Sequence, residues 1–195
     1  MKLVLASASP RRAALLDQIG LAHTASPTDI DETRRPDEAP GEYVERLARE
    51  KATAAAAMYE DVVVGADTAV VFEGHVMGKP AHPAEARSML LRLQGQRHEV
   101  FTGIAVRRRD EVVSAVDVTH VDMLAMTEEE IRGYVESGEP MDKAGAYALQ
   151  GTGGMYVRSV SGSPFTVVGL PIHLLARLLS RVGVGIDRFR QASSV

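Results

Sequence analysis

The sequence predicts an α/β fold, a twisted mixed sheet that is flanked by helices and holds a central cleft. Val-rich runs typical of buried strands alternate with amphipathic helical patterns along the chain, which is the arrangement of α/β proteins. With 195 residues and a hydrophobic content of 45%, the chain can build one sizeable core. Because it contains neither a repeat nor a low-complexity linker, we expect a single domain over residues 1–182 and a C-terminal tail over residues 183–195.

The first half of the chain is expected to contain two strands and two helices. We place the strands at residues 2–6 and 61–72, and the helices at residues 10–19 and 41–58. Gly20 ends the first helix, since glycine readily adopts the left-handed conformation that follows many helices. A hairpin turn at Glu73-Gly74 follows the second strand.

The second half continues the alternation. Thr127 and Glu130 have the spacing of a capping box, so a helix is expected to begin there and to run to about Ser137. Residues 138–154 form a Gly-rich loop that is long enough to suggest a function. The other expected elements are helices at residues 83–93 and 170–182, strands at 99–107, 111–124, 155–160 and 165–168, and a frayed tail from residue 183.

The composition restricts the partners and the compartment of the protein. The chain carries 22 Lys and Arg against 26 Asp and Glu, so no global positive field attracts nucleic acid polymers or anionic membranes. The absence of cysteine excludes disulfides, thiolate nucleophiles and Cys-ligated zinc, and it suits a reducing compartment. No secretory signal is evident, and no stretch approaches ~20 apolar residues. We therefore expect a cytoplasmic protein that contacts neither a membrane nor a nucleic acid polymer.

The segment Ala-Ser-Ala-Ser-Pro-Arg-Arg, at residues 6–12, links the first strand to the first helix. Ser9 is a favourable N-cap and Pro10 suits the first helical position, so the N–H groups at this helix end form an anion site. Arg11 and Arg12 lie in the first turn, where cations oppose the helix dipole unless an anion lies between them and the helix end. The alternative is a capped helix with two solvated arginines.

Lys51 lies near the centre of the apolar stripe of the helix at residues 41–58. The inward face of this helix therefore carries a cation. A buried ammonium needs an anionic partner, which a phosphate could supply. The alternative is a lysine that extends along the apolar surface until its ammonium reaches water.

Asp67 interrupts the apolar strand at residues 61–72. A carboxylate in such a strand must be paired, bound to a metal or protonated, because an isolated buried charge is very unfavourable. Gly65, two residues earlier, allows a ligand or another backbone to approach closely. The alternative is an aspartate that caps a turn at the end of the strand.

Two further groups complete the polar set. Lys79 lies between a glycine and a proline on an expected rigid loop, although a lone lysine is commonly a surface residue. Asp29, Asp31 and Glu32 form an acidic cluster that could share Mg²⁺ with Asp67, and the alternative is a solvated acidic loop. The six histidines show no metal-ligand spacing, and the Walker A, GxSxG and GxGxxG motifs are absent. Arginine, lysine and carboxylate together favour metal-dependent phosphoryl transfer.

These residues belong to segments that resemble the Maf proteins, nucleotide pyrophosphatases related in fold to the inosine triphosphate pyrophosphatases. The matching segments run in family order over almost the whole chain, apart from its last residues. They are ASASPRR at 6–12, DIDE at 29–32, LAREKA at 47–52, VVGADT at 63–68, GKP at 78–80, TG at 102–103, DKAGAYALQG at 142–151 and VVGLP at 167–171.

The resemblance implies two sets of site residues. The phosphate site would consist of Ser9, Arg11, Arg12, Lys51 and Lys79. The acidic centre would consist of Glu32 and Asp67, which would hold Mg²⁺ or Mn²⁺, and Asp67 matches the position regarded in the family as the proton acceptor.

The resemblance also points to a substrate branch. Arg11, Thr68 and Gln150 match the members that act on dTTP and UTP, rather than those that act on 7-methyl-GTP. One segment departs from the family. Where many members have an acidic or amide residue followed by an aromatic one, this chain has Gly-Ser-Pro-Phe at residues 162–165, so we assign no substrate contact to that loop.

We therefore expect a nucleoside triphosphate pyrophosphatase that converts dTTP, UTP or modified pyrimidine nucleotides into the monophosphate and pyrophosphate. Its partner is a small-molecule nucleotide, and the sequence leaves the oligomeric state open, a homodimer included. Two alternatives remain. One is a pyrophosphatase for 7-methyl-GTP or deaminated purines, and the other is a non-catalytic, nucleotide-binding regulator of septum formation, the role from which the family took its name. A regulator has less use for an inward Asp67 beside several cations.

Overall fold

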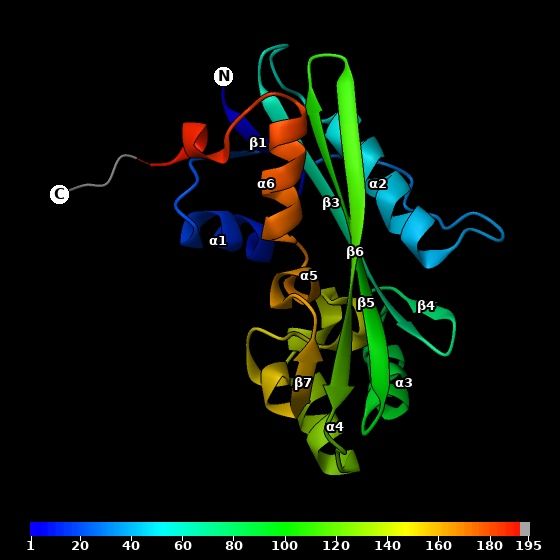
Figure 1. The fold of residues 1–195 in the computed structure, drawn as a ribbon. Coiled ribbons are helices and arrows are strands. Elements are labelled where there is room, and N and C mark those ends of the chain that lie inside the picture. Colours follow the sequence, from blue (N-terminus) through cyan, green and yellow to red (C-terminus); the bar gives the residue numbers. More distant parts are fainter. Residues whose placement is uncertain (192–195) are drawn as a thin grey trace. The chain divides into compact units, whose positions relative to one another are not determined.

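The structure, a computed structural model, describes residues 1–191. Its strands form one seven-stranded sheet in the order β2-β1-β3-β5-β6-β7, and β4 pairs with β3 (Figure 1). The pairs β1–β2 and β1–β3 are parallel, whereas β3–β4 and β6–β7 are antiparallel, which confirms the predicted mixed sheet. The strands are β1 (Leu3–Leu5), β2 (Thr24–Ala25), β3 (Val62–Phe72), β4 (His75–Met77), β5 (Arg97–Arg108), β6 (Glu111–Met123) and β7 (Val157–Ser161).

The α-helices are α1 (Pro10–Gln18), α2 (Pro40–Ala54), α3 (Pro83–Leu93), α4 (Glu128–Glu136), α5 (Pro164–Val168) and α6 (Ile172–Arg181). Helices α1 to α4 alternate with strands along the chain, as predicted, whereas α5 and α6 follow the last strand. Four 3-10 turns occur among residues 1–191: η1 (Glu139–Asp142), η2 (Ala144–Ala146), η3 (Thr152–Tyr156) and η4 (Ile186–Phe189). None of these helices is long and apolar enough to cross a membrane.

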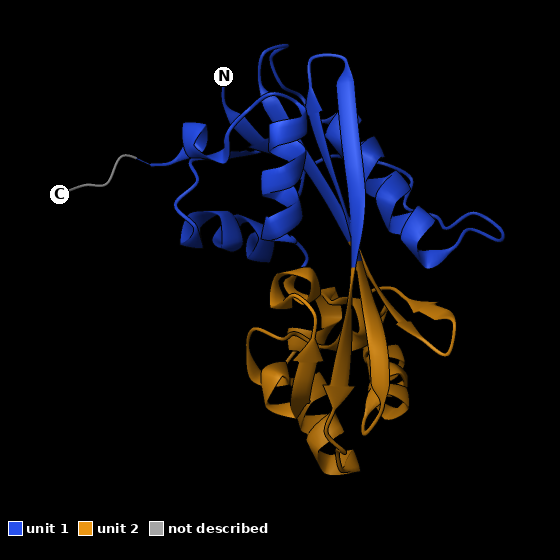
Figure 2. Ribbon diagram, viewed as in Figure 1, with its two compact units in different colours: residues 1–67, 102–117, 169–195 blue, residues 68–101, 118–168 orange. Residues whose placement is uncertain are grey.

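The chain divides into two compact units, each assembled from separate segments (Figure 2). Unit 1 contains residues 1–67, 102–117 and those from 169 onward, and unit 2 contains residues 68–101 and 118–168. The boundary falls inside the long strands β3, β5 and β6. No linker marks it, because the boundary lies within continuous strands, at Asp67, Thr102 and Asp117.

In unit 1, the backbone of α2 lies directly against β3 and β5. A side chain added at Gly65 would place its Cβ 2.2 Å from the carbonyl oxygen of Ala48, and one at Gly103 would meet that of Val44 at 2.3 Å. Only glycine permits such a close approach, which is the reason for Gly65 that the sequence suggested. The core around this contact is apolar and buried, and it includes Val4, Ala48, Ala52, Val63 and Ala105. The position of α2 on the sheet is therefore tightly fixed.

Unit 2 has its own core, to which α3, α4, β5 and β6 contribute. The buried side chains there include Leu90, Val100, Val121, Ile131 and Tyr134. The predicted capping box of α4 is present, since the Thr127 side chain accepts a hydrogen bond from the Glu130 N–H and the Glu130 carboxylate accepts one from the Thr127 N–H.

Some predicted boundaries and elements are wrong. Helix α2 ends at Ala54 rather than at residue 58, because Ala55 has an extended backbone (φ −63°, ψ 135°). The expected strand at residues 165–168 is helix α5, whose proline at position 164 suits a first helical turn and overrides the β-branched residues that follow. The two-residue strand β2 was not predicted.

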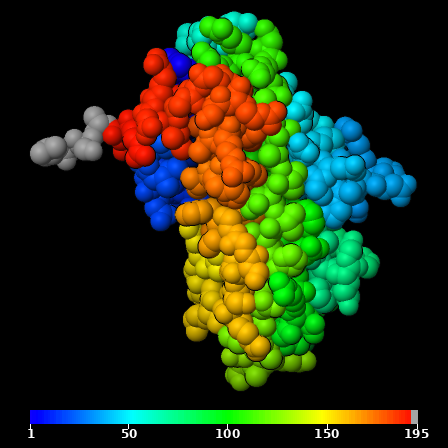
Figure 3. All heavy atoms as spheres, in the orientation of Figure 1, coloured from blue at the N-terminus to red at the C-terminus, as the bar shows by residue number. Residues whose placement is uncertain are grey.

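The segment after Gly183, which we expected to be frayed, is ordered up to residue 191. Turn η4 forms there, and the side chain of Phe189 is buried. The Ala22 N–H donates to the Phe189 carbonyl (2.7 Å), and the Gln191 N–H donates to that of Gly20 (2.8 Å). In Figure 3 this segment, in red, lies against the N-terminal part of unit 1, in blue. The rest of the predicted tail, residues 192–195, lies outside the described residues.

Candidate functional site

Lys51, Glu32 and Asp67 meet in unit 1. The Lys51 ammonium lies 2.6 Å from Oε1 of Glu32 and 2.6 Å from Oδ1 of Asp67. The side chains of Lys51 and Asp67 are 10% and 13% exposed, whereas that of Glu32 is 51% exposed. The predicted inward cation on α2 is confirmed. Of the three states that the sequence allowed for Asp67, the structure shows the paired one, and its partner is Lys51.

Strand geometry brings this pair together. Side chains two residues apart on a strand lie on the same face, so Asp67 faces the same side of β3 as Gly65. Gly65 lies under Ala48 of α2, and Lys51 follows Ala48 by three residues, about one helical turn. The close contact at Gly65 therefore sets the distance over which Lys51 reaches Asp67.

The acidic cluster before α2 does not act as one group. Asp31 accepts a hydrogen bond from the Thr33 N–H (2.9 Å), and its bonds from Thr33 lower the pKa of its carboxyl. Glu32 is the member that reaches Lys51, and Asp29 is exposed. Within residues 1–191, no group of three or more Asp, Glu and His side chains could hold a metal ion. The structure thus narrows the predicted acidic centre to Glu32 and Asp67.

Ser9, Arg11 and Arg12 lie at the N-terminus of α1. Ser9 occupies the N-cap position and Pro10 the first helical position, as predicted, but the Ser9 side chain makes no capping hydrogen bond. Instead the Ser9 N–H donates to the hydroxyl of Ser7 (3.2 Å). The expectation of a side-chain cap at Ser9 is therefore wrong, although the helix end itself is where the sequence placed it.

Arg12 is buried, which excludes the alternative of a solvated arginine at this position. Its Nε donates to the carbonyl of Gly169 (2.8 Å), and its Nη1 donates to the hydroxyl of Ser7 (3.0 Å). Burial lowers the pKa of Arg12, while the nearby charges of Asp67 and Glu32 oppose that shift. Arg12 therefore belongs to the same electrostatic cluster as the Lys51 centre, and Arg11 beside it is half-buried.

Sequence reasoning missed two residues that position Arg12. Ser7 belongs to the quoted segment at residues 6–12, but only Ser9 was assigned a role in it. Gly169 lies 157 residues after Arg12, and its carbonyl leaves no signal in a single sequence. The only available hint was that both segments resemble those of one family.

The remaining predicted site residues, Thr68, Lys79 and Gln150, lie in unit 2. Thr68 follows Asp67 in β3 and is half-buried, whereas Lys79 and Gln150 are exposed. The carbonyl of Gly78, next to Lys79, accepts a hydrogen bond from the Gly145 N–H (3.1 Å), which ties the two loops together.

The loop that carries Gln150 is organised by Glu139. Its Oε1 accepts hydrogen bonds from the Tyr134 hydroxyl (2.8 Å) and the Gly153 N–H (2.9 Å), and its Oε2 accepts one from the Thr152 N–H (3.0 Å). These bonds lower the pKa of Glu139 against an opposing effect of burial. A carboxylate thus fixes the backbone that follows Gln150.

Comparisons with known proteins identify the relatives of this chain. The family model described as Maf-like protein matches residues 2–182. The chain is 51% identical to the dTTP/UTP pyrophosphatase of Anaeromyxobacter dehalogenans (strain 2CP-C) over 186 residues, which cover 93% of this chain and 94% of that protein. It is 46% identical to the dTTP/UTP pyrophosphatase of Symbiobacterium thermophilum over 186 residues, which cover 95% of this chain and 96% of that protein. Among solved structures, the Staphylococcus aureus Ham1 protein shares the fold, with a TM-score of 0.52, 16% identity, and coverage of 93% of this chain and 100% of that one.

Proposed function

The chain belongs to the Maf family, and from this premise we propose that it is a nucleoside triphosphate pyrophosphatase that acts on dTTP and UTP. The observation that carries the proposal is the Lys51 centre, in which one ammonium joins Glu32 and Asp67 beside the buried Arg12. Carboxylates and cations in this arrangement suit the hydrolysis of a phosphoanhydride. We keep the expectation of a cytoplasmic enzyme, since its proposed substrates are soluble nucleotides.

In the proposed reaction, a water oxygen attacks the α-phosphorus of the nucleotide. A P–O bond forms to this oxygen, while the bond from the α-phosphorus to the oxygen that bridges to the β-phosphorus breaks. The bridging oxygen leaves with pyrophosphate, and the water oxygen remains in the nucleoside monophosphate. A proton from the water passes to a base.

We assign the proton-accepting role to Asp67. Its Oδ1 is held by Lys51 at 2.6 Å, which restricts the orientation of the carboxylate. Because the side chain is 13% exposed, few solvent molecules compete for it. A carboxylate that is held in this way suits general-base catalysis.

We propose that Glu32 and Asp67 hold Mg²⁺ or Mn²⁺. The donor set fits in its chemistry, because both carboxylates lie 2.6 Å from one ammonium and are therefore close neighbours, and the ion would bind them beside Lys51 rather than in its place. Mg²⁺ commonly takes one or two protein carboxylates and completes its coordination with water and substrate phosphates. When bound, the ion would neutralise phosphate charge and lower the pKa of a coordinated water.

Phosphate binding is assigned to the basic residues near this centre and to one in unit 2. Arg12 is held by Gly169 and Ser7, so its guanidinium is ordered before a substrate arrives. The N-terminus of α1 contributes backbone N–H groups near Ser9 and Arg11 that favour an anion. The full proposed set is Ser9, Arg11, Arg12, Lys51 and Lys79.

Recognition of the base is assigned to Gln150, with Thr68 and Arg11. An amide offers one donor and one acceptor, which match the N3–H and a carbonyl of uracil or thymine. Cytosine has the opposite pattern there, an unprotonated N3 and an amino group, so an amide held in the orientation that binds uracil would leave its bonds to cytosine unmade. The relatives at 51% and 46% identity are dTTP/UTP pyrophosphatases, which supports dTTP and UTP as the substrates.

A nucleotide panel tests the proposal. Purified protein is given Mg²⁺ and, separately, dTTP, UTP, dCTP, ATP, ITP and 7-methyl-GTP, and both products are quantified. We expect the highest kcat/KM for dTTP and UTP, with pyrophosphate as the product. A preference for 7-methyl-GTP or ITP would replace the pyrimidine assignment, and binding without turnover would favour a regulator.

A further inference from the structure

The segment that carries Glu32 has no strand or helix of its own. Residues 26–39 connect β2 to α2 without regular structure. The side chain of Glu32 is 51% exposed, yet its carboxylate lies 2.6 Å from the Lys51 ammonium. A half-exposed glutamate on an irregular loop loses much side-chain and backbone entropy when it is held at one point. Other contacts must therefore fix the backbone at Glu32.

Two hydrogen bonds from α2 fix this backbone. The Tyr43 hydroxyl donates to the carbonyl of Glu32 itself (3.0 Å), and Nη2 of Arg46 donates to the carbonyl of Thr33 (3.1 Å). Both donors lie on the helix that also carries Lys51. The same helix therefore positions both the loop and the Lys51 ammonium.

Arg46 is in turn held by Glu38, at the end of the same loop. Nε and Nη2 of Arg46 donate to the two carboxylate oxygens of Glu38, at 2.6 and 2.9 Å. Both side chains are largely buried, with 13% and 8% exposed, and the hydrogen bonds from Arg46 lower the pKa of Glu38 to about 2. The Arg35 N–H donates to the same carboxylate (3.1 Å), and Nε of Arg34 donates to the Glu38 carbonyl (2.9 Å).

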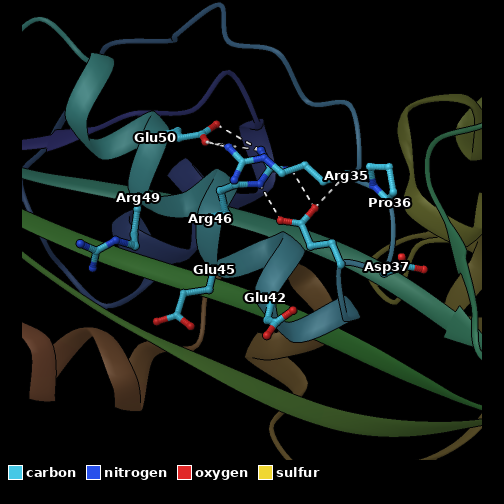
Figure 4. Close-up of a pocket in the computed structure, with 9 residues that line it drawn as sticks. Arg35, Pro36, Asp37, Glu42, Glu45, Arg46, Arg49 and Glu50 are labelled. Carbon is cyan, nitrogen blue, oxygen red and sulfur yellow. Dashed lines mark hydrogen bonds and ion pairs between the residues drawn. The ribbon is translucent and has the colours of Figure 1, made fainter.

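The surface around this pair is an open pocket of about 660 Å³, and both residues help to line it. In Figure 4, the Arg46 side chain points from α2 toward Glu50 and Arg35. Arg49 lies one turn further along the helix, and its side chain points away from that of Arg46. Arg49 is exposed and donates to Ser114 (3.0 Å) on β6 rather than to the loop. The chain therefore offers two arginines on one helix, of which one holds the loop.

We propose that Arg46, clamped by Glu38, and Tyr43 are positioning residues that hold the Glu32 carboxylate at the Lys51 centre. A largely buried ion pair commonly adds little net stability compared with an apolar pair, so its value lies in geometry. The planar guanidinium binds two carboxylate oxygens and a carbonyl at once, which an ammonium does not reproduce with the same geometry. This inference rests on the proposed function, because it assigns Glu32 a role in the site.

The test compares Arg46→Lys with the matched control Arg49→Lys. Hydrogen exchange measured by mass spectrometry should accelerate at residues 31–38 in Arg46→Lys and remain unchanged in the control. The Mg²⁺ concentration for half-maximal turnover should rise by roughly 10-fold in Arg46→Lys, within the ~10–100-fold range seen when a residue that orients a metal ligand is removed. If both variants behave alike in exchange and in Mg²⁺ dependence, the positioning role is overturned.

A double-mutant cycle with Glu32→Gln separates the role of Arg46 from that of Glu32. If Arg46 acts through Glu32, adding Arg46→Lys to Glu32→Gln should not change the Mg²⁺ dependence further. An undiminished effect of Arg46→Lys in that background would show that Arg46 acts elsewhere and would overturn the inference. If Glu32→Gln alone leaves turnover and Mg²⁺ dependence unchanged, the proposed site is wrong at Glu32, and the inference falls with it. Should Arg46→Lys not fold, Tyr43→Phe, which removes one hydrogen bond, takes its place in every arm.

Discussion

Lys51 and Asp67 form an ion pair of 2.6 Å between a helix and a strand, and both side chains are nearly buried. The pair exists because Gly65 lets the backbone of α2 lie directly on β3. Neither charge would be tolerated there alone. Its removal therefore has consequences for chemistry and for stability that can be measured separately.

Asp67→Asn should reduce kcat by at least ~100-fold, the lower end for the loss of a general base. The amide keeps the shape of the side chain, and Lys51 retains Glu32 as a partner, so the variant should fold. Circular dichroism and thermal unfolding check the fold, and product formation from dTTP checks the rate. A folded variant with near-normal turnover would remove Asp67 from the proton-accepting role.

Gln150→Ala should narrow the preference for dTTP over dCTP more than it lowers the rate with dTTP. Each hydrogen bond that is lost to the wrong base is worth ~1–3 kcal/mol, roughly five- to a hundred-fold in kcat/KM. The measurement is kcat/KM for both nucleotides in both proteins. An equal decrease for all nucleotides would mean that Gln150 only shapes its glycine-rich loop.

Glu139→Gln should destabilise unit 2, because the carboxylate accepts hydrogen bonds from Tyr134, Thr152 and Gly153 and a neutral amide cannot accept all three. The loss of one of these hydrogen bonds costs about 1 kcal/mol in the free energy of unfolding, to be measured by urea unfolding. Glu136→Gln, at an exposed position in α4, is the matched control. Equal stabilities of the two variants would contradict the role of Glu139.

His98 should make the protein less stable as the pH falls below 6.5. It is buried with its Nε2 2.8 Å from the Tyr147 hydroxyl, and burial lowers its pKa from 6.5 to about 4. The unfolded chain therefore binds a proton at a higher pH than the folded chain does. The contribution of the neutral His98 to the free energy of unfolding is fully present above pH 6.5. It is lost progressively toward pH 4, by about 3 kcal/mol in total.

Urea unfolding between pH 7 and pH 4 measures this loss. His98→Gln, which keeps a hydrogen-bonding group opposite Tyr147, should show a smaller decrease than the unmodified protein in that range. His75→Gln, at an exposed position in β4, serves as control and should follow the unmodified protein. The low pKa of Glu38 contributes a further loss only below about pH 4.5, where its unfolded form becomes protonated. Identical pH profiles for all three proteins would contradict the prediction for His98.

The parts of the site that depend on the pattern of neighbouring residues in one helix or strand could be predicted from the sequence. The helical stripe predicted that Lys51 faces inward, and the apolar strand predicted that Asp67 needs a partner, because both statements depend only on neighbouring residues. That each is the partner of the other depends on how α2 packs on β3. Gly65 was the one sign of this contact, and it did not identify the helix.

Other features depend on contacts that no local pattern encodes. Arg12 was interpreted from the first turn of its helix, whereas its position depends on a carbonyl at Gly169 in a distant segment. The β-branched run at residues 166–168 predicted a strand, but tertiary context and Pro164 make it helix α5. The positioning pair of Arg46 and Glu38 was missed, because charged residues on a helix and a loop are usually solvated.

The most direct test of the proposed reaction is hydrolysis of dTTP in ¹⁸O-labelled water with Mg²⁺, followed by mass spectrometry of both products. Attack on the α-phosphorus predicts one labelled oxygen in dTMP and unlabelled pyrophosphate. Label in pyrophosphate instead of dTMP, or release of orthophosphate with dTDP as the primary products, would contradict the proposed reaction.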